Sequence, residues 1–250
     1  MNKILALMIA LVLSVPAWAQ EDVLSAQDND KDSTNKMSNV VNFNIGLQLG
    51  FPTGEYKNQN DEVGFGIGGN LAFNIKGAPL YVGIDGAYLV MSSRERVEQF
   101  STTIPDVRVR VNTTNSHSFF HGFLRFQADE GPIQPYFEGL IGFNYLSTTT
   151  TIEDVDFDDD QDIASSNDLS DFAFSYGVGG GLAIPVSTFE SEEGHGMQLL
   201  IDLGAKYIKG GEAEYLKEDG KQIVDGEVIY EITKSRTDML SARIGVTLKF

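Results

Sequence analysis

Residues 41–51 read VNFNIGLQLGF, and every odd-numbered position in this stretch is apolar. The even-numbered positions hold only Asn, Gly and Gln. Because successive side chains of a β-strand point to opposite faces, a period of two predicts a strand with one apolar and one polar face. This stretch decides the fold, since the same alternation returns in segment after segment of the remaining chain.

Seven further segments repeat the alternation, each with a second face that is low in charge. They lie at 63–75, 80–90, 115–126, 136–146, 171–184, 197–208 and 240–250. Of the seven connections, three lie at one end, at 76–79, 127–135 and 185–196. The four at the other end include the long 91–114, 147–170 and 209–239 and the shorter 52–62. Short turns at one end and long loops at the other are typical of a membrane β-barrel. We therefore expect an all-β, transmembrane, eight-stranded antiparallel up-and-down barrel with short periplasmic turns and longer extracellular loops.

Two of the long connections carry strand signals of their own. Arg and Val alternate from Arg108 to Val111, which predicts that the strands flanking 91–114 protrude above the membrane as a hairpin. Within 209–239 we expect extensions of the flanking strands that turn at Asp219-Gly220. The arginines are candidates for contact with anionic lipopolysaccharide, although an ordinary polar extension is the plainer interpretation.

The aromatic residues argue against a soluble β-sandwich or lipocalin-like barrel. A soluble sheet turns a charged face to water, whereas the second face here carries mainly Gly, Asn and Ser. With odd strands running upward from the periplasm, Phe43, Phe73, Phe126, Phe137 and Phe250 fall at the lower end. A second group falls at the upper end: Phe51, Phe65, Tyr88, Phe120, Tyr145, Phe174, Tyr176 and Tyr207. Two aromatic girdles around an aliphatic band are what a bilayer favours.

The composition excludes several classes of protein. The 250 residues include no Cys, so disulfides, thiolate catalysis and cysteine-ligated metals are ruled out. Acidic residues outnumber basic ones 36 to 18, and a formal net charge of -18 argues against nucleic acid as a partner. Past residue 19 no apolar run is long enough for a transmembrane helix. We expect no cofactor.

The first 40 residues are expected to lie outside the barrel domain, which we place at 41–250. Residues 1–19 read MNKILALMIALVLSVPAWA, with Lys3 before an apolar core and Ala17-Trp18-Ala19 at its end. This pattern is typical of a secretory signal peptide cleaved after Ala19. Residues 20–40 show no period and are rich in Asp, Asn and Ser, which predicts a disordered N-terminal arm.

Two segments carry a resemblance to a known family. They are the terminal strand SARIGVTLKF at 241–250 and the stretch PYFEGLIGF at 135–143. Together with the leader they resemble the OmpA-like and OmpX-like outer-membrane β-barrel domains, often grouped as the porin family. The resemblance implies a monomeric barrel in the outer membrane of a Gram-negative bacterium, in contact with its lipid and lipopolysaccharide. It also implies that the barrel-assembly machinery reads Val246, Leu248 and Phe250 as an insertion signal.

The polar faces of the strands would line the lumen of such a barrel. An eight-stranded barrel is just wide enough to be filled by side chains, and glycines here face bulky residues such as Tyr81 and Phe123. Buried charges need partners. We therefore expect Asp85, Glu138 and Asp202 to pair with Arg125, Lys206 and Arg243, with Lys249 as a further candidate. The network is either a structural plug, which we favour, or part of an ion-conducting path.

An acidic loop is the candidate metal site. Its carboxylates, which suit calcium or magnesium, come from Asp154, Asp156, Asp158, Asp160 and Asp162. The EF-hand spacing fails, because its sixth position is Asp159 rather than Gly and its twelfth is Ser165 rather than Glu. A solvated surface loop without metal is therefore the favoured interpretation.

Catalysis has little support in the sequence. Ser116 and Ser118 flank His117, but neighbours in a strand point to opposite faces and cannot act as a nucleophile and base. We expect a non-enzymatic structural or surface-interaction protein. The alternatives are a porin for small solutes or ions and, less favoured, a lipid A-modifying outer-membrane enzyme.

Overall fold

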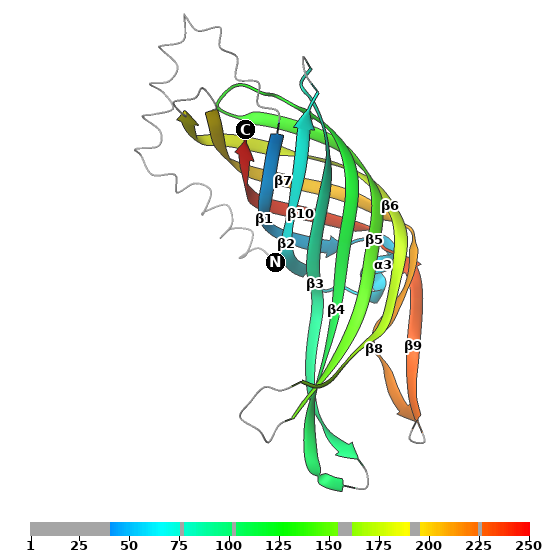
Figure 1. Cartoon of the computed structure of the whole chain (residues 1–250). Helices are drawn as coiled ribbons and strands as arrows, with labels where there is room; N and C mark the ends of the chain where they lie inside the picture. Colours follow the sequence, from blue (N-terminus) through cyan, green and yellow to red (C-terminus); the bar gives the residue numbers. More distant parts are fainter. Residues whose placement is uncertain (1–40, 76–77, 102–103, 155–161, 191–195, 225–226) are drawn as a thin grey trace, which may run out of the picture.

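The computed structural model describes residues 41–75, 78–101, 104–154, 162–190, 196–224 and 227–250. Eight antiparallel strands close into a barrel in the order β1-β10-β7-β6-β5-β4-β3-β2 (Figure 1). They are β1 (Val41–Pro52), β2 (Gly64–Asn74), β3 (Leu80–Ser101), β4 (Ile104–Gln127), β5 (Gln134–Asp154), β6 (Asp162–Glu190), β7 (Gly196–Gly210) and β10 (Met239–Lys249). A separate two-stranded sheet holds β8 (Glu212–Val224) and β9 (Glu227–Arg236). The predicted eight-stranded barrel is confirmed.

Helices play a small part in the described chain. Helix α3 (Gly54–Gln59) lies between β1 and β2. None of the helices in the described ranges combines the length and the apolar character needed to cross a membrane.

The barrel closes where the first strand meets the last. The backbone N–H of Phe250 donates to the Val41 carbonyl at 2.9 Å, and the Val41 N–H donates back to the Phe250 carbonyl at 3.3 Å. Eleven residue pairs from Asn42↔Lys249 to Pro52↔Met239 complete this seam. Closure leaves no unpaired sheet edge around the barrel wall.

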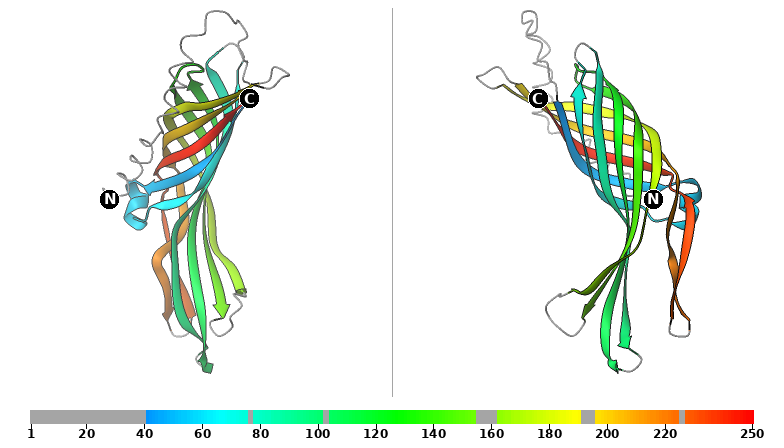
Figure 2. Two further views of the ribbon diagram at one scale, coloured as in Figure 1. Left: turned by 90° about the vertical axis from the view of Figure 1, so that its left-hand side faces the viewer. Right: turned by 45° about the vertical axis from the view of Figure 1, so that its right-hand side comes forward.

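The register fixes how strongly the strands tilt. Ladder partners followed around the barrel from Leu182 of β6 return to that same strand at Phe172, ten residues away. A stagger of this size in eight strands corresponds to a tilt of about 40° from the barrel axis. The tilt carries each strand obliquely across the wall, as both views of Figure 2 show.

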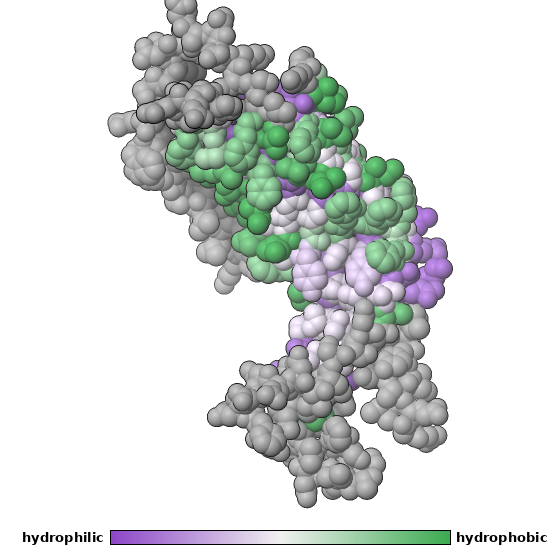
Figure 3. Space-filling model, viewed as in Figure 1, coloured by the Kyte–Doolittle hydropathy of each residue, from purple (hydrophilic) through white to green (hydrophobic). Residues whose placement is uncertain are grey.

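The alternation with a period of two separates the side chains that face outward from those that face the lumen. Apolar residues point outward and are exposed, including Ile67, Phe137 and Ile141 at 59%, 62% and 59%. The alternate residues point inward and are buried. Phe126 lies opposite Phe137 at one end of the wall, and Phe143 lies between Phe120 and Phe174 at the other. On the face seen in Figure 3, hydrophobic residues cover much of the barrel wall, while hydrophilic ones gather toward the end from which the strands protrude.

The long connections are largely strand rather than loop. Pairing of β3 with β4 continues to Ser101↔Ile104, so the predicted protruding hairpin is confirmed. Pairing of β5 with β6 continues to Glu153↔Asp162, so the prediction of a loop over 147–170 was wrong for most of its length. Its β-branched run from Thr148 to Thr151 favours a strand. Together these segments form a four-stranded extension beyond the barrel (Figure 1).

The predicted turn at Asp219-Gly220 was also wrong. Both residues lie within β8, and the hairpin reverses between Val224 and Glu227. The hairpin leaves the barrel at Gly211, whose N–H donates to the Phe174 carbonyl at 2.7 Å and whose carbonyl accepts from the Thr237 N–H at 3.1 Å. These bonds turn the chain away from β7, so β8 and β9 form their own sheet instead of extending the barrel strands.

The lumen as the candidate functional site

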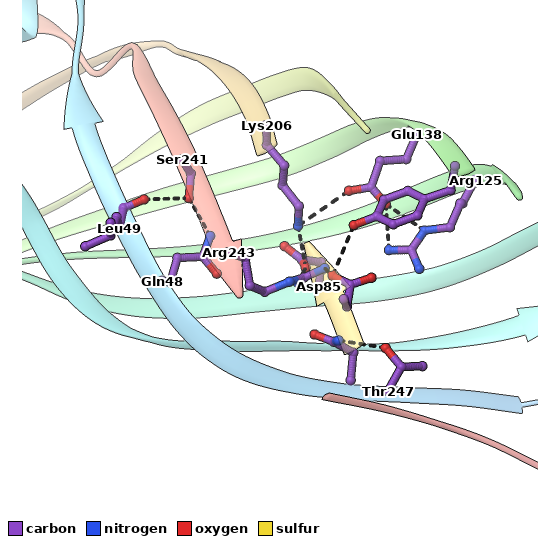
Figure 4. A network of polar contacts seen from close by, with 12 residues as sticks. Gln48, Leu49, Asp85, Arg125, Glu138, Lys206, Ser241, Arg243 and Thr247 are labelled. Carbon is purple, nitrogen blue, oxygen red and sulfur yellow. Dashed lines mark hydrogen bonds and ion pairs between the residues drawn. The ribbon is translucent and has the colours of Figure 1, made fainter. Parts of the chain in front are cut away.

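A network of buried charges occupies the middle of the lumen (Figure 4). The Arg125 guanidinium contacts Glu138 through Nη2 at 2.7 Å and Nε at 2.8 Å. The Lys206 ammonium lies 2.5 Å from Asp85 and 3.6 Å from Glu138. Arg243 reaches Asp85 at 3.0 Å and Asp202 at 3.5 Å. Six of the seven lumen residues expected from the sequence thus meet in one network.

The closed wall brings these charges together because each charged residue occupies an inward-facing position on its strand. The six side chains come from β3, β4, β5, β7 and β10 and are at most 3% exposed. Three carboxylates face three cations, so the network is neutral as a whole. Neutrality matters because an ion withdrawn from water without a partner costs several kcal/mol.

Aromatic side chains complete the network, and the sequence did not show this role. The Tyr136 hydroxyl donates to Asp202 at 3.1 Å. The Arg125 guanidinium lies over the Tyr136 ring at 4.3 Å and over the Phe123 ring at 4.8 Å. Such stacking over aromatic faces stabilises a desolvated guanidinium.

Glycines on the facing strands make room for these rings. A Cβ added at Gly204 would lie 2.5 Å from the Tyr136 hydroxyl oxygen, and one at Gly83 would lie 2.7 Å from Cζ of Phe123. Both distances are far below van der Waals contact. The expected packing of small residues against large ones in the lumen is confirmed.

Lys249 departs from the expected pairing. Its ammonium lies 3.2 Å from Asp129, in the turn between β4 and β5, and not beside the central carboxylates. Lys249 is the last inward residue of β10, so it stands at the rim of the barrel and meets the turn instead of the middle of the lumen. The Tyr81 hydroxyl donates to the same Asp129 oxygen, Oδ1. Asp129 therefore ties β3 to β10 at the end of the barrel where β4 turns into β5.

Side-chain hydrogen bonds reinforce the closing seam. Asn44 Nδ2 donates to the Thr247 hydroxyl at 2.8 Å, and Gln48 Nε2 donates to the Ser241 hydroxyl at 2.5 Å. The Ser241 hydroxyl in turn donates to the Leu49 carbonyl at 3.0 Å (Figure 4). The predicted assembly signal occupies the opposite face of β10. Its three residues, Val246, Leu248 and Phe250, all turn outward. Val246 and Phe250 are exposed, and Leu248 is half-buried.

An apolar plug closes the end of the lumen from which the strands protrude. Leu89, Ile208 and Met239 are completely buried there, and Tyr56 of α3 covers them from above at 2% exposure. The Tyr56 ring meets the His117 ring edge-on, with centroids 5.7 Å apart. Sequence periodicity could not reveal this plug, because Tyr56 lies outside every alternating segment.

Hydrogen bonds with Arg236 and Asp238 hold α3 in place over the plug. The Thr53 N–H donates to the Asp238 carbonyl at 2.9 Å, which joins the start of the helix to β10. Gly54 then adopts φ +59, a left-handed conformation that side-chain-bearing residues rarely take. Glu55 accepts from the Arg236 N–H at 3.3 Å. The loop between β1 and β2 is thereby fixed as a cover over the barrel.

The comparisons with known proteins match the barrel only at low identity. No protein-family model and no curated protein matches the sequence. Neisserial surface protein A is 10% identical with a TM-score of 0.38, covering 84% of this chain and 95% of that one. Ail, the attachment invasion locus protein of Yersinia pestis solved with the heparin analogue sucrose octasulfate, is 12% identical with a TM-score of 0.39 over 84% and 97%. A major outer membrane protein from Thermus thermophilus is 11% identical with a TM-score of 0.37 over 84% and 99%. Scores this low carry no information about the function of this chain.

The lumen also holds a serine–histidine pair that was not predicted from the sequence. His121 Nε2 lies 2.8 Å from the Ser175 hydroxyl, which joins β4 to β6 across the interior. The two residues are 54 positions apart, so only the barrel register brings them together. Both are completely buried, and we therefore assign the pair to the packing of the lumen. Ser116 bonds instead to the Ser147 hydroxyl of β5 at 2.7 Å.

The acidic candidate loop falls mostly outside the described residues. Asp156, Asp158 and Asp160 lie in the segment 155–161, which the structure does not describe. Asp154 ends β5 and Asp162 begins β6. Within the described ranges, no group of three or more His, Cys, Asp or Glu side chains is placed to hold a metal ion.

Proposed function

We propose that this protein is an integral outer-membrane barrel with a non-enzymatic structural or surface-interaction role. The observation that carries the proposal is the combination of an exposed apolar wall with a polar, packed lumen. A soluble barrel has the opposite arrangement, because its apolar residues fill the interior. An apolar surface that runs around the barrel wall is typical of a protein embedded in lipid.

The dimensions of the wall support a membrane location. A strand tilted by about 40° needs about ten residues to cross an apolar band roughly 25 Å tall. Outward apolar residues run along β1 from Phe43 to Phe51 and along β5 from Phe137 to Tyr145. The aromatic residues at the two ends of these runs match the interfacial girdles of outer-membrane barrels.

The polar extension above the barrel supports a role at the cell surface. Thr148 donates to Asn115 at 2.7 Å and Asn115 donates to Ser92 at 3.0 Å, which links three strands through their side chains. Arg110 lies 2.8 Å from Glu95 and Arg94 lies 3.6 Å from Glu62. These contacts link the strands of a polar sheet, and a polar surface carried beyond the barrel suits surface recognition.

The proposal implies a set of partners. Outer-membrane lipid and lipopolysaccharide would surround the wall of a monomeric barrel. The barrel-assembly machinery would read the outward residues of β10 during insertion. Exchange of Phe250 for Gln, with Lys249 unchanged, tests this last point: we expect less inserted protein and an unaltered fold of the fraction that inserts.

A porin is the second candidate, and the contents of the lumen argue against it. The Asp129–Lys249 contact spans the periplasmic end of the lumen, and the charge network fills its middle. The plug beneath α3 closes the extracellular end. Reconstitution into planar lipid bilayers separates the two functions. We expect no channel activity, and discrete, reproducible conductance steps would establish a pore.

A further inference from the structure

The connection between β6 and β7 is not the short turn expected at 185–196. The two strands continue to pair beyond the barrel, through Ser187↔Leu199, Thr188↔Gln198 and Phe189↔Met197 to Glu190↔Gly196. The pairing of β5 with β6 begins only at Gln134↔Ala183. From Ile184 to Glu190, no described strand pairs with β6 on the side of β5. The paired residues 184–190 and 196–199, here called the periplasmic hairpin, therefore project from the rim on the side of the C-terminus (Figure 1).

One face of the periplasmic hairpin is apolar apart from Ser187, which lies opposite Leu199. Leu199 lies beside Leu248 and, like Ile201, faces outward on the barrel wall. Met197 is two residues away on the same strand and therefore shares this face. Phe189 lies opposite Met197, so it faces the same way. Phe189 is 51% exposed, and the bulged Val186 is 47% exposed.

The opposite face of the hairpin is polar. Thr188 lies opposite Gln198, whose other neighbour is the inward-facing Lys249. Thr188 is exposed because the hairpin has left the barrel at this point. The hairpin is thus amphipathic, with Phe189 and Thr188 pointing to opposite faces at adjacent positions.

The tilt of the strands sets where the hairpin goes. A straight strand that leaves a cylinder at about 40° to its axis continues along a tangent, so its path has a sideways component that leads away from the lumen and over the surrounding surface. The seven residues from Ile184 to Glu190 extend roughly 20 Å. Figure 2 shows the end of β6 projecting sideways from the rim beside the C-terminus. Around a membrane barrel, the surface beneath that projection is the headgroup region of the lipid.

We propose that the periplasmic hairpin lies on the periplasmic lipid leaflet, with Val186, Phe189 and Met197 inserted at the headgroup–acyl boundary. This inference rests on the proposed membrane location. Lipid is the occupant because the apolar face is continuous with the outward wall through Leu199 and Ile201 and ends on an aromatic residue. Aromatic rings favour the membrane interface. Ile133, 52% exposed in the neighbouring turn, adds to the same apolar rim.

Tryptophan scanning tests the proposal. Trp18 is the sole tryptophan of the sequence, so a Trp18→Phe background has none whether or not the leader is removed. Three single-tryptophan variants are compared in this background: Phe189→Trp on the apolar face, Thr188→Trp on the polar face and Val178→Trp on the exposed middle of β6. Each is reconstituted in phosphatidylcholine vesicles brominated either near the headgroup or deep in the acyl chains.

The three variants give distinguishable outcomes. We expect deep bromines to quench Val178→Trp and shallow bromines to quench Phe189→Trp. Aqueous iodide should quench Thr188→Trp most strongly. If iodide quenches Phe189→Trp as strongly as Thr188→Trp while Val178→Trp still responds to bromine, the hairpin stands free in the periplasm and this inference is wrong. If Val178→Trp also escapes bromine quenching, the membrane location itself is overturned.

Discussion

Lys249 and Asp129 are 120 residues apart in the sequence and meet at 3.2 Å across the end of the lumen opposite the Tyr56 plug. The contact joins the closing strand β10 to the turn between β4 and β5, on the far side of the barrel. Tyr81 of β3 donates to the same carboxylate. Asp129 therefore connects three parts of the wall: β3, β10 and the turn between β4 and β5.

Exchange of Asp129 for Ala should loosen this end of the barrel. The change leaves the buried ammonium of Lys249 without its carboxylate, and we expect the free energy of unfolding to fall by about 1–3 kcal/mol. Urea unfolding of the vesicle-reconstituted protein, followed by circular dichroism, measures the difference. Glu130→Ala is the matched control, because Glu130 is exposed in the same turn. Equal unfolding midpoints for the two variants would show that the contact adds nothing.

Removal of one cation from the central network should have a larger effect. Arg243 lies between Asp85 and Asp202, so Arg243→Met leaves two buried carboxylates with less compensation. Breaking a buried ion pair in this way costs about 3–5 kcal/mol of stability. Arg236→Met on β9, where the side chain is exposed, serves as the control in the same unfolding measurement. A loss no greater than that of the control would contradict a buried, dry network.

The Arg125–Glu138 pair allows the coupling itself to be measured. Either Arg125→Met or Glu138→Met alone should destabilise the protein, because each leaves an unmatched charge. The double variant removes both charges, while Lys206 keeps its contact with Asp85. We expect the double variant to lose less than the sum of the singles, with a coupling of about 0.5–3 kcal/mol. Strict additivity would mean that the two side chains do not interact.

The sequence predicts the barrel well because the signal is local. An alternation of two residues assigns each side chain to the wall or the lumen before any partner is known, and Phe137 and Glu138 fall on opposite faces as a result. Complementary charges at inward positions then made the central network predictable. The partner of Lys249 was not predicted because Asp129 lies in a connection, outside every alternating segment. The Tyr56 cover and the His121–Ser175 pair depend on strand register, which only the closed barrel supplies.

The β8–β9 hairpin should be dispensable for the barrel. It forms a sheet of its own, and Glu214 and Lys234 lie opposite each other near its base. We expect replacement of residues 215–233 by an Asn-Gly turn to preserve the closed barrel, since this turn suits a two-residue hairpin. The buried Ala213 is retained in this design. A retained difference in electrophoretic mobility between the folded and heat-denatured forms and an unchanged unfolding midpoint are the expected results; failure to fold would show that the hairpin supports the wall.

Removal of the Tyr56 ring should weaken the extracellular plug without opening a pore. Tyr56 is 2% exposed and packs on His117, so Tyr56→Ala leaves a cavity above Leu89 and Met239 and should cost about 3–5 kcal/mol. Lys57→Ala in the same helix is the control, because the Lys57 side chain is 61% exposed. The charge network beneath the plug remains packed, and we therefore expect planar bilayers with Tyr56→Ala to stay silent. Conductance steps in this variant alone would mean that the plug, and not the network, keeps the lumen closed.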